Sequence, residues 1–208
     1  MALRVKTVFF KNAGGRSTAE IASVLASTIW RLSDEVVANL SKWDCDIITP
    51  ERGIKILGEM SAFLLHMSDR MAYHRIADDD RARFIQAAGQ RLSEIMQDNI
   101  RAMVGDDGFD YKANFIDLIN RRAADYATFE CPPDKPSFPI LRYLGLAVRE
   151  HMLESDQHWV ADQIMDIQAP EALGMLKKTV GGLLASPEPT EQRAAVPGDK
   201  AVSPGNRT

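Results

Sequence analysis

Cysteine is nearly absent from this sequence, since Cys45 and Cys131 are the only two and they do not form a CxxC pair. Neither a disulfide framework nor a thiolate metal site is indicated, because both depend on closely spaced sets of cysteines. Cys45 stands between two aspartates, which raise the pKa of a neighbouring thiol, so we expect structural cysteines rather than nucleophiles. This usage of cysteine is typical of a reducing compartment and predicts a cytoplasmic protein.

Long apolar runs are also missing, and no stretch approaches the roughly 20 uninterrupted apolar residues that a spanning helix needs. The first fifteen residues, MALRVKTVFFKNAGG, lack the apolar run and the Ala-x-Ala signature of a secretion signal. The sequence therefore predicts no transmembrane segment. Its last apolar stretch carries Lys177 and Lys178 beside five Leu and Val residues, a composition that favours a partner surface over peripheral membrane contact.

A strong excess of either charge is absent, because the net charge is −4 and the lysines and arginines are scattered along the chain. This distribution argues against DNA or RNA as a partner. Motifs of common enzymes are absent as well: there is no Gly-x-Ser-x-Gly elbow, and the glycines of Asn12–Ser17 precede a helix without a Walker lysine. These absences favour a non-enzymatic protein.

What the sequence does contain is one helical pattern after another. Its 208 residues, 45% of them hydrophobic and 26% charged, suffice for one domain with a substantial core. Apolar residues recur at helical spacing between clear start and stop signals. The expected helices run over about 17–42, 50–76, 78–104, 110–130, 139–167 and 169–184. We predict an all-α, single-domain antiparallel helical bundle of about six helices.

Several of the helix boundaries have a specific chemical signal. Ser17 and Glu20 can form a capping box, and Pro50 suits a first helical position after a threonine. Asp110 precedes the fourth apolar run, and Gly105 follows the third. Outside the bundle domain, 17–185, we expect an N-terminal arm over 1–16 that packs on the bundle. We expect a disordered tail over 186–208, because that segment holds four of the ten prolines and no aromatic residue.

All four histidines fall in two of the expected helices, and this is the main chemical signal in the chain. At 100° per residue, Glu59 and His66 share one stripe of the second helix, with Asp69 beside it. In the fifth helix His151, Glu154 and His158 point the same way. Imidazole and carboxylate groups are the ligands of iron and manganese inside helical bundles. If the two helices face each other, the six residues predict a metal site: His151, Glu154, His158, Glu59, His66 and Asp69.

Two other interpretations compete with the metal site. Di-iron bundles carry Glu-x-x-His, whereas this sequence has the reversed orders His-x-x-Asp and His-x-x-Glu. The same side chains therefore also fit polar networks that fix the register between helices. A histidine-centred acid–base or partner-binding role is the third reading. The leading prediction is a non-enzymatic protein that acts through protein contacts, as a regulator, adaptor or assembly factor, with a protein partner or a second copy. The iron or manganese bundle is the alternative, with Arg70 or Tyr143 supporting the ligands.

Overall fold

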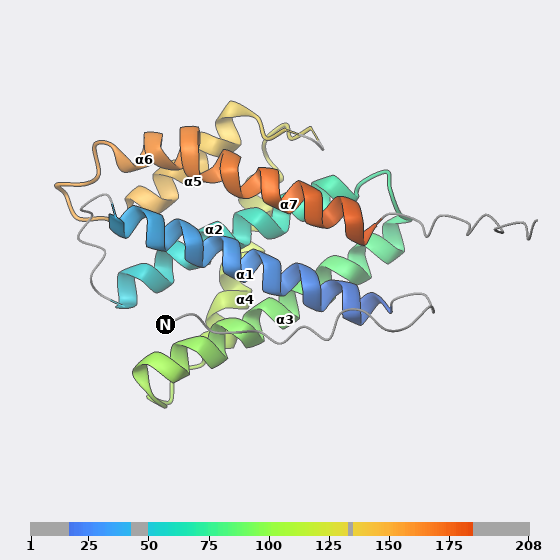
Figure 1. Cartoon of the computed structure of the whole chain (residues 1–208), viewed down its shortest axis with the longest axis horizontal. Helices are drawn as coiled ribbons and strands as arrows, with labels where there is room; N and C mark the ends of the chain where they lie inside the picture. The colour runs from blue at the N-terminus through green and yellow to red at the C-terminus, as the bar shows by residue number, and fades with distance from the viewer. Residues whose placement is uncertain (1–16, 43–49, 133–134, 185–208) are drawn as a thin grey trace, which may run out of the picture.

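A computed structural model describes residues 17–42, 50–132 and 135–184, and every regular element within these ranges is a helix (Figure 1). The elements are α1 (Thr18–Lys42), α2 (Pro50–Ala72), α3 (Asp78–Val104), α4 (Tyr111–Tyr126), α5 (Phe138–Arg149), α6 (Val160–Gln163), the π-helix η1 (Ile164–Gln168) and α7 (Ala169–Leu183). Because α6, η1 and α7 follow one another without a break, they count as one helix, and six helices pack together. The predicted all-α bundle is confirmed. The predicted arm and tail lie outside the described residues.

Local capping groups begin the helices where the sequence predicted them. The backbone N–H of Ser17 donates to the Glu20 carboxylate at 2.8 Å, and the Glu20 N–H donates back to the Ser17 hydroxyl at 3.3 Å. At the start of α4, the Asp110 carboxylate accepts from the N–H of Ala113 at 2.9 Å. Gly105 ends α3 with a φ of 85°, a left-handed conformation that favours glycine. These contacts span three or four residues, which is why sequence alone predicts them.

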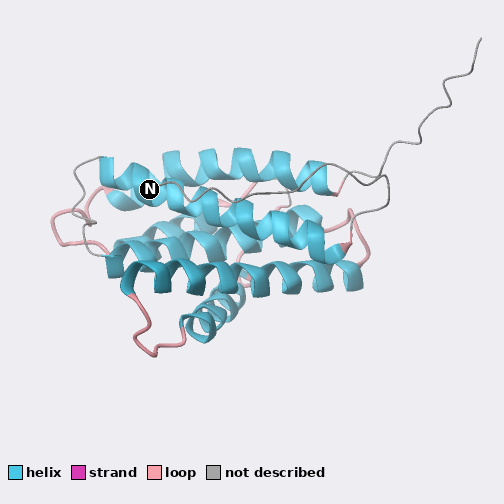
Figure 2. Cartoon of the chain, turned by 60° about the horizontal axis from the view of Figure 1, so that its bottom comes forward, coloured by secondary structure: helices cyan, strands magenta, loops and turns pink. Residues whose placement is uncertain are grey.

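Helix α2 lies at the centre of the bundle and contacts α1, α3, α4, α5 and α7. Every residue from 56 to 65 is buried, including Glu59. Figure 1 shows α2 running behind α1 along the long axis, and Figure 2 shows α4, which follows the loop after α3, nearly end on. Gly58 lies where α4 packs on α2, and a Cβ there would lie 3.0 Å from Leu118 Cδ2. The polar stripe of α2 therefore faces other helices.

The expected continuous helix over 139–167 is wrong. α5 ends at Arg149, residues 150–159 form turns, and the chain becomes helical again at Val160. Between Leu153 and Trp159 the sequence has no apolar side chain, so a continued helix would have had nothing to bury there. The chain instead reverses and packs α6 back against α5, where Gly145 of α5 lies against the α6 backbone. The common helix face predicted for His151, Glu154 and His158 therefore does not form.

The expected helix over 169–184 is present as α7, Ala169–Leu183, and it continues without a break from helical backbone that begins at Val160. Pro170 lacks an N–H, and the turn before it widens to a π-helix in which the Ala169 N–H bonds to the Ile164 carbonyl. A π-turn of this kind accommodates a proline inside a helix. Helix α2 also ends earlier than expected, at Ala72, and His74 beyond it adopts a φ of 65°.

Candidate functional site

The six residues predicted as metal ligands lie in two segments of the fold. Glu59, His66 and Asp69 are on α2, as expected, whereas His151, Glu154 and His158 lie in the turns between α5 and α6. One close pair results: His151 Nε2 lies 3.5 Å from Glu59 Oε1. The side chains of Glu154 and His158 are exposed, and the carboxylate of Asp69 binds a different partner, Arg81, at 2.6 Å.

The described part of the chain holds no group of three or more His, Cys, Asp or Glu side chains placed to share a metal ion. A metal site inside a bundle needs several such ligands converging on one point. The arrangement gives the iron or manganese hypothesis no geometric support, and it stays a prediction from sequence.

Glu59, which the sequence predicts as a metal ligand, forms a buried ion pair in the structure. Glu59 is 2% exposed, and Arg122 of α4 reaches it across the helix interface. Arg122 Nε donates to Glu59 Oε2 at 2.6 Å and Nη2 donates to Oε1 at 2.7 Å. Two parallel bonds between a guanidinium and a carboxylate form the strongest common ion-pair geometry in proteins. Arg122 therefore neutralises the central charge of α2.

The ion pair extends into a polar network that includes α5. Arg122 Nη1 donates to the Tyr143 hydroxyl at 2.6 Å and contacts the Asp125 carboxylate at 3.3 Å. The Tyr143 hydroxyl in turn donates to Asp125. This network, made of Glu59, Arg122, Asp125, Tyr143 and the neighbouring His151, ties α2, α4, α5 and the turns after α5 together.

Three groups of this network, Glu59, Arg122 and Tyr143, each keep one protonation state near neutral pH. Burial by itself would raise the pKa of Glu59, but the contacts with His151 and Arg122 outweigh it and hold the pKa below its usual value. Hydrogen bonds to Glu59 raise the pKa of Arg122 further, despite burial. Burial and the bond to Asp125 raise the pKa of Tyr143 to about 12. Glu59 is therefore an ionised structural anchor at neutral pH and not a free general base.

An open cleft, here called the His151 cleft, lies beside this network. It has a volume of about 490 Å³ between α2, α3 and α4, and His151 closes one side. Its lining residues are Ile54, Lys55, Gly58, Glu59, Met96, Ile100, Tyr111, Asn114, Phe115, Leu118, Arg121, Arg122 and His151. One part of this lining is apolar and buried, and another part is charged.

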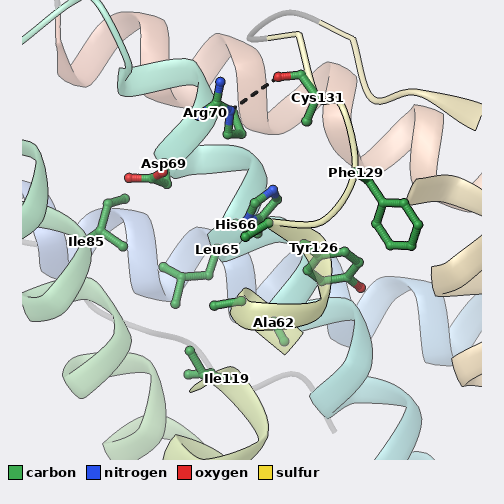
Figure 3. Close-up of a pocket in the computed structure, with 12 residues that line it drawn as sticks. Ala62, Leu65, His66, Asp69, Arg70, Ile85, Ile119, Tyr126, Phe129 and Cys131 are labelled. Atoms are coloured by element: carbon green, nitrogen blue, oxygen red, sulfur yellow. Dashed lines mark hydrogen bonds between the residues drawn. The ribbon is translucent and has the colours of Figure 1, made fainter. Parts of the chain in front are cut away.

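A second cavity of about 490 Å³, here called the His66 cavity, lies further along α2 between α2, α3 and α4 (Figure 3). The turn after α4 covers it with Phe129 and Cys131. Its walls are Ala62, Leu65, Ile85, Ile119, Ala123, Tyr126, Ala127, Phe129 and Cys131, and its polar groups are His66, Asp69 and Arg70. Arg70 Nε donates to the backbone carbonyl of Cys131 at 3.3 Å and holds the covering turn in place.

His66 and Tyr126 meet at the wall of this cavity, with ring centroids 5.1 Å apart. Within the described residues, His66 Nε2 and the Tyr126 hydroxyl are both buried without a hydrogen-bond partner. Burial lowers the pKa of His66 to about 4, although Asp69 partly opposes this effect. Burial also raises the pKa of Tyr126. Both rings are consequently neutral near pH 7.

Cys131 is the cysteine that falls in the described residues, and its thiol lies 3.7 Å from the sulfur of Met67. Burial raises the pKa of this thiol, and the nearby Arg70 only partly compensates. A thiol with a raised pKa is a poor nucleophile at neutral pH. Cys45 lies outside the described residues.

Sequence reasoning missed Arg122 as the partner of Glu59, although a signal for it exists. In α4 the buried positions Phe115 and Tyr126 are eleven residues apart, and Arg122 lies on the same face at i+7 from Phe115. A charge at a core-facing position needs a buried partner of opposite charge. The sequence predicts Tyr143 only as a supporting group and does not predict a role for Asp125.

Comparison with protein-family models, with curated proteins and with solved structures finds no match to this chain. No helix within residues 17–42, 50–132 and 135–184 is long and apolar enough to cross a membrane.

Proposed function

We propose that this protein binds a small, largely apolar organic molecule in the His66 cavity. The observation that carries the proposal is the cavity itself, which has a volume of about 490 Å³ and walls from three helices and a turn. Small-molecule sites in proteins typically have volumes of about 300–1,000 Å³, apolar walls and a few polar groups that orient the ligand. The His66 cavity has each of these properties.

The polar end of the cavity has fixed geometry. The Asp69 carboxylate is held by Arg81 at 2.6 Å, and the Arg70 guanidinium lies 4.8 Å from the centre of the Tyr73 ring. Charged groups that are already oriented lose little conformational entropy when a ligand binds. A ligand with an apolar body and one polar group would fit, with its polar group towards Asp69 and Arg70.

A binding role fits the titratable groups of this cavity better than catalysis. A general acid or base works best when its pKa lies near the working pH. The pKa of His66 is lowered to about 4, and burial raises the pKa of the Cys131 thiol, so both groups are unreactive near pH 7. We therefore propose a non-enzymatic binding protein.

Titration of the full chain with 1-naphthol, an aromatic probe with one hydroxyl group, tests this proposal by isothermal calorimetry. The variant Ala123→Leu adds three carbon atoms to the cavity wall, whereas Ala124→Leu changes an exposed residue outside it. We expect naphthol to bind the wild type, and Ala123→Leu to weaken binding by about tenfold or more, equivalent to about 1.4 kcal/mol. Ala124→Leu should leave binding unchanged. Absence of binding, or equal effects of the two variants, would refute the proposal.

Protein contacts are a second candidate function, favoured by the exposed corner between α3 and α4. Met103, Val104 and Phe109 are 60%, 45% and 49% exposed there. Single exposed apolar residues are common, but neighbouring ones point to a contact surface. Asp106 and Asp107 stand between them in the sequence and are exposed as well. We propose that this corner binds a partner segment that is both apolar and basic.

A synthetic amphipathic peptide of leucine and lysine is a suitable probe for the corner. We expect the double variant Met103→Ser/Phe109→Ser to lose binding of this peptide, measured by fluorescence anisotropy. Phe138→Ser removes a phenylalanine that is 63% exposed elsewhere and serves as the control. Equal loss in both variants would show non-specific adhesion, and the corner would not be the contact surface.

A further inference from the structure

The His151 cleft carries more positive than negative charge, although the whole chain has a net charge of −4. Three basic residues line it, Lys55, Arg121 and Arg122, against one acidic residue, Glu59. A cleft lined mainly by positive charge raises the local concentration of anions, even in a protein whose net charge is negative. The lining therefore favours an anion.

The three basic residues differ in how their charge is used. Arg122 is paired with Glu59 through two hydrogen bonds, and Lys55 pairs with Glu51 at 2.8 Å. Arg121 is exposed, and no hydrogen bond or ion pair links it to the parts of the chain that the structure describes. Its guanidinium group is therefore the basic group of the cleft that has no charged partner among the described residues.

One wall of the cleft is apolar, although Tyr111, Asn114 and His151 also line the cleft. Met96 and Ile100 of α3 and Phe115 of α4 are each 3% exposed or less, and they line the interior side. Ile54 and Leu118 are half-buried and complete the apolar surface. The volume of about 490 Å³ is much larger than a simple inorganic anion requires. The apolar wall therefore favours a ligand that has an apolar part.

We infer that the His151 cleft binds an amphipathic monocarboxylate, with its carboxylate on Arg121 and its apolar chain against Met96, Ile100 and Phe115. A guanidinium fork matches the two oxygens of a carboxylate, and a single free fork matches a single carboxylate. The Glu59 charge does not repel this ligand strongly, because Arg122 already neutralises it. This site is separate from the His66 cavity and goes beyond the function proposed for it.

Octanoate is the probe for this inference, with 1-octanol and octylamine as neutral and cationic controls of the same chain length. Binding of each to the full chain at pH 7.5 is measured by isothermal titration calorimetry. We expect octanoate to bind at least about tenfold more tightly than octanol, because a charge-assisted hydrogen bond to arginine is lost in the alcohol. Octylamine should bind most weakly, and octanoate binding should weaken as salt concentration rises.

Two matched variants locate the carboxylate. Arg121→Gln should reduce octanoate affinity to that of octanol and leave octanol binding unchanged, whereas Arg142→Gln, an exposed arginine of α5 outside the cleft, should change neither. Ala123→Leu should also leave octanoate binding unchanged, which separates this site from the His66 cavity. The inference is overturned if octanoate does not bind, if octanol binds as tightly, if Arg121→Gln has no effect, or if Ala123→Leu abolishes octanoate binding.

Discussion

His66 should make the protein less stable as the pH falls below neutrality, and His66→Phe should remove this effect. In the folded protein, burial lowers the pKa of His66 to about 4, against 6.5 for an unperturbed histidine. Between these pH values the unfolded chain binds a proton at this residue and the folded chain does not. Stability that depends on neutral His66 is therefore present above pH 6.5 and is lost as the pH falls towards 4.

The size of the effect follows from the two pKa values. Their difference is about 2.5, and at about 1.4 kcal/mol for each pH unit the loss is about 3 kcal/mol. Such a loss is a large fraction of the roughly 5–15 kcal/mol by which natural domains are stable. Phenylalanine keeps an aromatic ring beside Tyr126 and does not titrate. It also removes a buried nitrogen that has no hydrogen-bond partner among the described residues.

Urea unfolding followed by circular dichroism, at several pH values from 7.5 to 4.5, measures the free energy of unfolding of both proteins. Carboxylates such as Glu59 also titrate in acid, so the informative quantity is the difference between variant and wild type at each pH. We expect this difference to grow in favour of His66→Phe by about 2–3 kcal/mol as the pH falls.

A flat difference for His66→Phe would refute the reasoning, because it would mean that His66 has the same pKa in the folded and unfolded states. A difference of opposite sign would mean that the folded protein stabilises the protonated imidazole, with Asp69 outweighing burial.

The remaining predictions concern the buried network, two glycines and the metal hypothesis. Arg122→Leu leaves Glu59 buried without its arginine partner. This variant should lower the free energy of unfolding, measured by urea titration, by about 3–5 kcal/mol. The double variant Glu59→Leu/Arg122→Leu should recover most of the lost stability. Gly145→Ala should destabilise by about 1–3 kcal/mol, because its Cβ would lie 3.0 Å from a backbone carbonyl oxygen of α6. Gly174→Ala, whose Cβ would meet nothing within 4 Å, should stabilise by about 0.5–1 kcal/mol, and a melting curve that orders these two variants the other way would contradict the packing argument. Near-stoichiometric iron or manganese in tag-free protein, lost in His151→Ala, would establish the metal site that the geometry does not support.

Much of the fold was predictable from sequence, because its helix signals are local. The capping box of Ser17 and Glu20 and the cap at Asp110 each involve groups three residues apart. Gly105 ends α3 through its own backbone conformation. The apolar periodicity of each long helix likewise reports which face is buried. None of these features depends on how the helices are arranged in space.

The candidate site was only partly predictable, because its contacts join distant parts of the chain. Glu59 was predicted as a site residue, but its pairing with Arg122 crosses 63 positions. His151 reaches Glu59 because the chain leaves the helix after Arg149, whereas a helical wheel assumes that the helix continues. The spacing of His151, Glu154 and His158 would place the three side chains on one face of a helix. Because the chain is not helical there, the spacing does not bring them together.

The sequence by itself determined the fold class of this protein, since its apolar periodicity and most of its helix ends predict an all-α bundle of about six helices. The tertiary structure decided what the faces of those helices meet. It placed α2 at the centre, so that Glu59 became a buried charge and required Arg122, and it opened the His66 cavity and the His151 cleft between α2, α3 and α4. The physical reason is that helix formation follows from short-range bonds and amphipathicity, whereas burial, ion pairing and cavities arise only when separate helices pack.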